Sequence, residues 1–303
     1  MLNLWSWRDV AEKPHVGVSE GPNLDRVLDL QVVDSALDSI SALWECEPRV
    51  QELEHRLSSW LKRVTERVAL TPKALTVPVA LLECWAAGVT YQMSRDARLE
   101  ETKGAEPFYR LVYEAERPEI FFKAPGNRVV GPGAWVGLRR DSDWQIPEPE
   151  LTVILDPAGE LFGFTVGNDM SSRDIEGENP LYLPQAKIFH QSAAIGPSIV
   201  LAGTWDSAVQ DITMEIRRAG QMVFEGAVNT ALMRRSPELL VRYLRRDWPI
   251  EGWTALMTGT AIVPPAEFSL EENDEIAIAI SGIGRLVNYA RRIGPTWANV
   301  PNL

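Results

Sequence analysis

Apolar residues recur at intervals of three or four in two stretches near the start of the chain, with polar and charged residues between them. The apolar positions are Val33, Leu37, Ile40 and Trp44 in the first stretch and Val50, Leu53, Leu57, Leu61, Val64 and Val68 in the second. This spacing predicts two amphipathic helices. We expect Asp34 or Ser35 to cap the first helix and Thr71-Pro72 to end the second, because proline disfavours helical geometry in the residue before it.

From about Ala74 onward the pattern changes to short strands. Residues 151–155 and 161–166 are apolar runs separated by the turn sequence Asp-Pro-Ala-Gly at 156–159, so they predict a β-hairpin. Three further elements are predicted in the same way: a second hairpin over 211–228, a helix that starts at Ser236-Pro237-Glu238 and continues to Leu244, and a strand at 276–280.

Many strands with few helices favour a β-rich α+β fold over a βαβ nucleotide-binding fold. The sequence Gly282-Ile283-Gly284 lacks the third glycine of a dinucleotide motif and follows a predicted strand late in the chain, so it does not indicate nucleotide binding. We divide the chain into a small helical N-terminal accessory region, residues 1–73, and a β-rich main domain, residues 74–303.

Charge and composition narrow the class of protein. The chain has 303 residues, with 30 basic and 42 acidic side chains and a net charge of −12, and no Lys/Arg run stands out, so we expect no nucleic-acid partner. No uninterrupted apolar segment approaches the length of a membrane span, and no secretory signal precedes the first predicted elements. Cys46 and Cys84 lie far apart and form no CxxC pair. We therefore expect a soluble, cytoplasmic protein.

Two carboxylates open the first predicted strand. Glu148 and Glu150 are two residues apart in an extended segment, so both point to the same side, and the hairpin brings Asp169 toward the same end. A divalent cation with oxygen ligands, such as Mg²⁺, would offset the repulsion among these groups. The alternative is a pair of solvent-facing glutamates followed by an Asn-Asp turn.

Lys187 stands in a largely apolar stretch, which indicates either a poorly hydrated general base or a side chain that extends to solvent. No GxSxG motif supports a serine nucleophile. The polar, charge-rich stretch 92–116 is either a solvated helix and loop or a lid over a site.

These residues together resemble the fumarylacetoacetate hydrolase family. The matching segments follow the family order from about Ala74 to the C-terminus. They are Glu148-Pro149-Glu150-Leu151, the run 163–174 (Gly-Phe-Thr-Val-Gly-Asn-Asp-Met-Ser-Ser-Arg-Asp), Pro184-Gln185-Ala186-Lys187, Gly196-Pro197 and Thr258-Gly259-Thr260.

The resemblance implies a β-rich mixed sheet rolled around a metal site, in a homodimer or a homotetramer. It implies that Glu148, Glu150 and Asp169 hold Mg²⁺ or another divalent cation such as Mn²⁺ or Ca²⁺, and that Lys187 is the active-site lysine. By the same resemblance, the substrate is bound by residues of the matching segments, which are Ser171, Arg173, Gln185, Thr258, Gly259 and Thr260.

The departures from the family pattern bear on the reaction. Where family C–C hydrolases carry a water-activating histidine and its glutamate partner, this chain has Ser94 and Ala97, and serine cannot act as a base near neutral pH. Residues 172–183 instead resemble the 2-dehydro-3-deoxy-D-arabinonate dehydratases, as does the helical region before the catalytic domain. This likeness implies dehydration of a 2-dehydro-3-deoxy pentonate to 2,5-dioxopentanoate, in oxidative pentose catabolism.

The chemistry expected of such a site begins with a 2-keto acid that chelates the metal. Lys187, or a hydroxide on the metal, would remove the C3 proton, and Glu100 or Glu101 on the polar stretch would assist departure of the C4 hydroxyl. Arg95 and Arg98 are either substrate-facing or solvated. The alternatives are an acylpyruvate-type C–C hydrolase, a 2-keto acid decarboxylase or tautomerase, and a binding or structural protein without activity.

Overall fold

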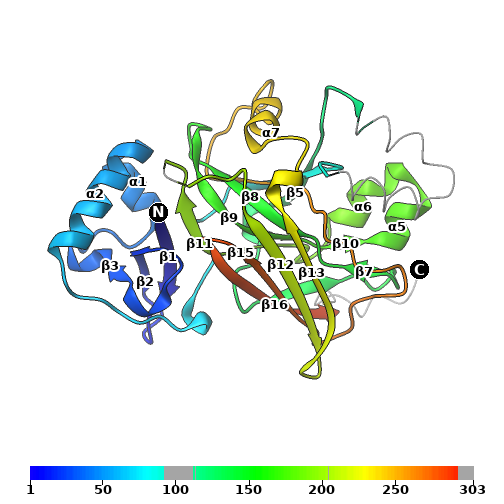
Figure 1. Ribbon diagram of the computed structural model, residues 1–303, viewed down its shortest axis with the longest axis horizontal. Helices are drawn as coiled ribbons and strands as arrows, with labels where there is room; N and C mark the ends of the chain where they lie inside the picture. Colours follow the sequence, from blue (N-terminus) through cyan, green and yellow to red (C-terminus); the bar gives the residue numbers. More distant parts are fainter. Residues whose placement is uncertain (92–111, 113, 204, 293–303) are drawn as a thin grey trace.

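The computed structural model of the protein describes residues 1–91, 112, 114–203 and 205–292 (Figure 1). Within these ranges the chain forms two large β-sheets, a two-stranded pair and a few short helices. The β-rich α+β fold predicted from the sequence is therefore confirmed. None of the described helices is both long and apolar enough to cross a membrane.

The first sheet has the strand order β3-β2-β1-β11-β9-β8-β14-β4-β5. Most of its neighbours are antiparallel, but β14 pairs with β4 in parallel. Its strands are β1 (Leu2–Arg8), β2 (Pro14–Glu20), β3 (Leu28–Asp29), β4 (Glu83–Gly88), β5 (Glu119–Pro125), β8 (Pro149–Leu155), β9 (Leu161–Asp169), β11 (Ala193–Leu201) and β14 (Thr254–Met257).

The second sheet has the order β13-β12-β15-β16-β6 and packs face to face on the first. Alternation along its strands points one set of side chains inward, where Ile212 and Ile278 meet Val153 and Phe164 of the first sheet in one buried cluster. Its strands are β6 (Trp135–Leu138), β12 (Asp211–Arg218), β13 (Gln221–Asn229), β15 (Glu275–Ile280) and β16 (Gly284–Arg292); β7 (Gln145–Ile146) and β10 (Ser171–Ser172) form the separate pair.

Two N-terminal helices cover the opposite face of the first sheet. Their apolar stripes join a second buried cluster with Ile154 and Phe162, and Trp44 packs edge to face on Phe162 with ring centroids 5.4 Å apart. The helices are α1 (Ile40–Cys46) and α2 (Val50–Arg63). The central strands β8 and β9 are thus buried on both faces, which fixes the position of the residues at their ends.

The N-terminal region contains both predicted helices, but their bounds differ from the prediction. The N-cap of α1 is Ser39, whose hydroxyl accepts from the Ala42 N–H, and neither Asp34 nor Ser35 caps this helix. The second helix ends at Arg63, well before Thr71-Pro72, because the chain turns extended and Val68 forms a bridge with Val27.

Three strands in this region were not predicted. They extend the first sheet, since β1 pairs with β11, and that pairing crosses the proposed boundary at residues 73 and 74. The division into two domains stays a prediction.

The later predicted elements are confirmed. Both hairpins form, β8 with β9 and β12 with β13, and β15 is the predicted late strand. The remaining short helices are α5 (Arg173–Glu178), α6 (Leu183–Lys187) and α7 (Pro237–Leu244), with 3₁₀ turns η1 (Leu24–Arg26), η2 (Leu30–Val32), η3 (Pro72–Ala74), η4 (Gly126–Arg128), η5 (Pro180–Tyr182) and η6 (Thr230–Leu232).

Candidate functional site

The β8–β9 hairpin brings three acidic residues together at one end of the first sheet. Glu148 precedes β8, Glu150 lies within it and Asp169 ends β9, and the hairpin register places Glu150 opposite Gly167. The Asp169 N–H donates to the Glu148 carbonyl at 3.0 Å, and this hydrogen bond holds the two chain segments together at this end of the hairpin. All three side chains are buried, and each offers a carboxylate oxygen within 4.8 Å of the others. The three predicted ligands therefore lie in one cluster.

Lys187, the last residue of α6, reaches this cluster. Its Nζ lies 2.5 Å from Glu148 Oε2 and 3.0 Å from Asp169 Oδ2, and the side chain is buried. The short helix that presents it starts with Pro184 in its first turn and ends where Ile188 becomes extended. The lysine thus faces the carboxylates and not solvent.

A second buried lysine, Lys123 of β5, was missed by the sequence analysis. Its Nζ lies 2.5 Å from Asp169 Oδ1, donates to the Met170 carbonyl at 2.9 Å and also bonds the Lys187 carbonyl. Burial lowers the pKa of the Lys123 ammonium, whereas the charge of Asp169 opposes that shift. The available signal was a lysine inside the apolar run 120–124, the same signal that identified Lys187.

The segment that follows β9 adds two buried charged residues to the site, the cation Arg173 and a fourth carboxyl, Glu176. Arg173 is buried, and its Nη2 lies 3.5 Å from Glu148 Oε1. Ser171 donates from its hydroxyl to Glu176 Oε2 at 3.1 Å, and Glu176 is buried at the pocket wall. Ser171 therefore contacts the site through Glu176, whereas Arg173 contacts Glu148 of the acidic cluster directly.

The Thr258-Gly259-Thr260 loop lies against Glu150. The Gly259 N–H donates to Glu150 Oε2 at 2.6 Å, and Gly259 has φ +94°, where a side chain would meet the Thr90 hydroxyl at 2.0 Å. Only glycine fits this close approach. Thr258 donates from its hydroxyl to the Leu151 carbonyl at 2.8 Å and so holds the loop on β8, and Thr260 lines the pocket.

Gln185, predicted to bind substrate, does not line the pocket with these groups. Its side chain is exposed, and its main-chain carbonyl accepts from Arg139 Nη1 at 2.9 Å. Because α6 turns Lys187 inward, the residue two positions earlier faces away. The candidates Glu100 and Glu101, with Arg95, Arg98, Ser94 and Ala97, lie outside the described residues.

Glu119, the first residue of β5, is a further carboxyl at the pocket that the sequence analysis missed. It is half-buried and lies opposite Gly88, the last residue of β4. A side-chain carbon on Gly88 would lie 2.1 Å from Glu119 Oε2. The glycine therefore leaves the space that the Glu119 carboxylate occupies.

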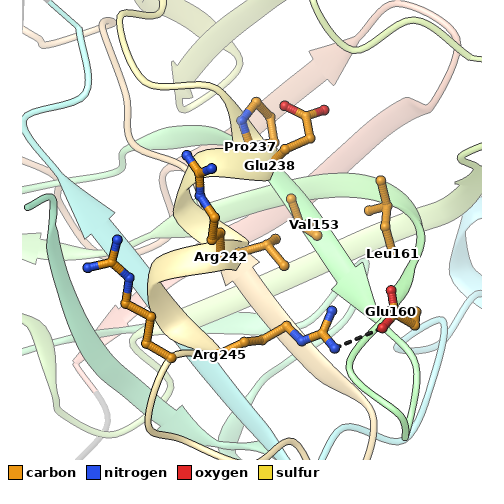
Figure 2. Close-up of a pocket in the computed structure, with 9 residues that line it drawn as sticks. Val153, Glu160, Leu161, Pro237, Glu238, Arg242 and Arg245 are labelled. Atoms are coloured by element: carbon orange, nitrogen blue, oxygen red, sulfur yellow. Dashed lines mark hydrogen bonds and ion pairs between the residues drawn. The ribbon is translucent and has the colours of Figure 1, made fainter.

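A separate pocket lies between α7 and the β8–β9 turn (Figure 2). It has an apolar floor that includes Val153 and Leu161, and arginines at its rim, of which Arg245 forms an ion pair with Glu160 at 2.8 Å. None of the acidic cluster residues lines it. The acidic cluster and Lys187 line a different pocket, at the end of β8 and β9.

The electrostatics of the acidic cluster suit a divalent cation. Burial is the main cause that raises the pKa of Glu150 well above its usual range, and the charges of Asp169 and Glu148 raise it further. Three close, buried carboxylates provide the hard oxygen donors that Mg²⁺ prefers. A cation there would stabilise the ionised form of all three groups.

We expect Mg²⁺ binding to release a proton and to strengthen as the pH rises. Because the pKa of Glu150 is raised, the metal-free protein keeps the Glu150 carboxyl protonated above the pH at which glutamates usually ionise. The stability that this protonated carboxyl contributes to the folded protein is present at low pH and is lost as the pH rises through the folded-state pKa. Mg²⁺ must displace the proton. Calorimetric titration in two buffers of different ionisation enthalpy measures the release; an unchanged Mg²⁺ affinity between pH 5 and pH 8 would contradict it.

Comparison with known proteins defines the class to which this fold and site belong. Residues 97–291 match the fumarylacetoacetate (FAA) hydrolase C-terminal family, and the chain belongs to the fumarylacetoacetate hydrolase family. A fumarylacetoacetate hydrolase from psychrophilic Exiguobacterium antarcticum, at 20% identity and a TM-score of 0.68, shares the fold.

The relatives within this family include dehydratases. The chain is 43% identical over 263 residues to a probable 2-keto-3-deoxyxylonate dehydratase of Haloferax volcanii, covering 86% of this chain and 90% of that protein. It is 46% identical over 222 residues to the 2-dehydro-3-deoxy-D-arabinonate dehydratase of Saccharolobus solfataricus, covering 72% and 74%. A 2-keto-3-deoxy-D-arabinonate dehydratase solved in complex with magnesium and 2,5-dioxopentanoate superposes with a TM-score of 0.77 at 36% identity, covering 97% of this chain and 100% of that one.

Proposed function

We propose that this protein is a metal-dependent dehydratase that converts a 2-dehydro-3-deoxy pentonate of the D-arabinonate or D-xylonate type to 2,5-dioxopentanoate. The observation that carries the proposal is the buried cluster of Glu148, Glu150, Asp169 and Lys187 in a chain 43–46% identical to dehydratases of such sugar acids. The magnesium and product in the solved relative support the same metal and the same reaction here.

The residues present fit a divalent cation, with Glu148, Glu150 and Asp169 as its protein ligands. Bound there, Mg²⁺ would polarise the 2-keto group of the substrate and so acidify the C3 protons. Gly259 orients Glu150 for this purpose through its N–H, and Lys123 orients Asp169 through its ammonium.

Lys187 is the proposed base for the C3 proton. Its buried Nζ is held at the carboxylates, so once it has lost its own proton the neutral amine has a fixed position beside any substrate bound at the cluster. When Lys187 takes the proton from C3, the electron pair of that bond forms the C3–C4 double bond and the C4 hydroxyl departs. Loss of a proton from C5 and return of one to C3 then give the C4–C5 enol. Protonation of that enol at C4, with loss of the proton of the C5 hydroxyl, gives the aldehyde.

Departure of the C4 hydroxyl as water needs a proton donor, and we propose Glu119 from among the described residues. Glu119 lines the same pocket as the acidic cluster, enters it from β5 and has its space provided by Gly88. The alternative donors Glu100 and Glu101 stay predictions.

The direct test is incubation of the purified protein with Mg²⁺ and 2-dehydro-3-deoxy pentonates of both C4 configurations. We expect 2,5-dioxopentanoate, detected through its aldehyde and by mass spectrometry, and no product after chelation of the metal. Cleavage of acylpyruvates without dehydration would instead support the C–C hydrolase. Decarboxylation or enolisation of a keto acid lacking the C4 hydroxyl, with no dehydration, would support the decarboxylase or tautomerase.

The partners follow from this assignment. We propose a small 2-keto acid as the substrate, and a homodimer or homotetramer in the cytoplasm as the working form; the oligomer and the location stay predictions. A binding or structural role without activity is disfavoured because the three clustered carboxylates and Lys187 are all buried and lie together.

A further inference from the structure

A buried arginine outside the pocket holds the chain just before β5. Arg235 lies between η6 and α7 and is only 4% exposed. Its Nη1 donates to the Glu116 carbonyl at 3.1 Å, and its Nη2 donates to the carbonyls of Ala115 at 2.7 Å and Val112 at 2.8 Å. Hydrogen bonds from a charged donor are stronger than neutral ones, so this one guanidinium fixes the backbone at Val112, Ala115 and Glu116.

A side chain of α7 adds a second contact to the same segment. The Tyr243 hydroxyl donates to Glu116 Oε1 at 3.1 Å, and the Arg117 guanidinium lies 5.7 Å from the centre of the Tyr243 ring. The segment is therefore held through both its main chain and its side chains.

The stretch that carries Arg235 also holds the chain that leaves β4. The Arg234 N–H donates to the Thr90 carbonyl at 3.0 Å, and Tyr91 forms a β-bridge with Met233. Thr90 in turn donates from its hydroxyl to the Thr258 carbonyl at 2.7 Å, beside the loop that contacts Glu150. Two chain segments that adjoin the pocket-lining residues Val89 and Glu119 are thus fixed to residues 230–243.

The geometry points to a positioning residue for the reaction. Glu119 enters the pocket only three residues after Glu116, and the residue before it, Pro118, is buried. A displacement of the backbone at Glu116 would therefore be transmitted to the start of β5. We propose that Arg235, by holding Val112, Ala115 and Glu116, sets the position of the Glu119 carboxyl in the pocket. This proposal rests on the proposed function, in which Glu119 is the proton donor.

The first test is Arg235→Lys, which keeps the charge but loses the planar fork that bonds several carbonyls at once. We expect kcat to fall about 10²-fold because a small misplacement of a reacting group is enough for that loss. KM and Mg²⁺ affinity should stay unchanged. The matched control is Arg242→Lys: Arg242 is exposed on α7, faces the pocket of Figure 2 and makes no hydrogen bond or ion pair within the described ranges, so full activity is expected.

A double-mutant cycle with Glu119→Gln separates positioning from a general structural role. If Arg235 acts through Glu119, Arg235→Lys should cost less than about threefold when Glu119 is already glutamine, because the two losses are not additive. An equal loss in both backgrounds, or loss of Mg²⁺ binding together with thermal stability, would overturn the proposal. Tyr243→Phe removes only the hydrogen bond to the Glu116 carboxylate, so it should lower kcat by a smaller factor. This variant replaces Arg235→Lys in the cycle if Arg235→Lys does not fold.

Amide hydrogen exchange tests the anchor without any substrate. Exchange over residues 114–122 should be faster in Arg235→Lys than in the wild type, and unchanged exchange would overturn the anchoring role. A wild-type protein that shows no dehydration would refute the proposed function instead, so the two failures are distinguishable.

Discussion

Glu148→Gln is expected to abolish Mg²⁺ binding and turnover together. The amide removes one of the three charges of the acidic cluster and leaves the Lys187 and Arg173 cations, which both contact Glu148, without that anion. The remaining site has less charge to attract a divalent ion and an excess of positive charge beside it. We expect kcat/KM to fall by at least about 10³-fold, equivalent to about 4 kcal/mol of transition-state stabilisation. Calorimetric titration with MgCl₂ and steady-state kinetics measure the two effects.

The matched control is Glu54→Gln. Glu54 is a buried carboxyl far from the cluster in the chain, it accepts from the Gly203 N–H at 3.1 Å, and burial raises its pKa. An amide can accept the same hydrogen bond, so Mg²⁺ binding and activity should persist. Turnover by Glu148→Gln with Mg²⁺ still bound would refute the assignment of Glu148 as a ligand.

The parts of the fold that the sequence predicted correctly are those fixed by local interactions. The β8–β9 hairpin follows from two apolar runs around an Asp-Pro-Ala-Gly turn, and α7 from Ser236, which accepts from the Leu239 N–H as an N-cap. The strand β1 was missed because it is buried on both faces and shows no alternation. Its polar residue Asn3 donates to the Ser198 hydroxyl and the Gly282 carbonyl, partners that no local pattern specifies.

The same distinction applies to the site. Glu148, Glu150 and Asp169 lie at one end of one hairpin, so their spacing indicated that they could meet, although a solvent-facing pair of glutamates stayed the alternative until the family resemblance was added. Lys123 and Glu119 enter from β5, which reaches the site only through its pairing with β4 and the parallel pairing of β4 with β14. Sequence spacing does not encode such long-range pairings. The hydrogen bond from Arg235 to the Glu116 carbonyl is likewise a tertiary contact between segments more than a hundred residues apart in the sequence.

Lys187→Met is expected to lower kcat about 10²–10⁴-fold, the range typical of a lost general base, without loss of Mg²⁺ binding. Removal of an ammonium that lies 2.5 Å from Glu148 and 3.0 Å from Asp169 takes away a cation that competes for the same oxygens. Mg²⁺ affinity should therefore stay equal or rise, the opposite of the effect of Glu148→Gln. Titration with MgCl₂ measures this difference.

Hydrogen exchange at C3 shows whether the fall in kcat of Lys187→Met comes from slower removal of the C3 proton. The exchange is followed in D₂O with a 2-keto acid that lacks the C4 hydroxyl. This exchange needs the base but not the acid, so it should disappear in Lys187→Met and persist in Glu119→Gln. Lys187→Arg should not restore it, because a guanidinium keeps the charge but does not give up its proton near neutral pH. C3 exchange that persists in Lys187→Met would place the base elsewhere, and the buried Lys187 would then serve only to balance the charge of Glu148 and Asp169.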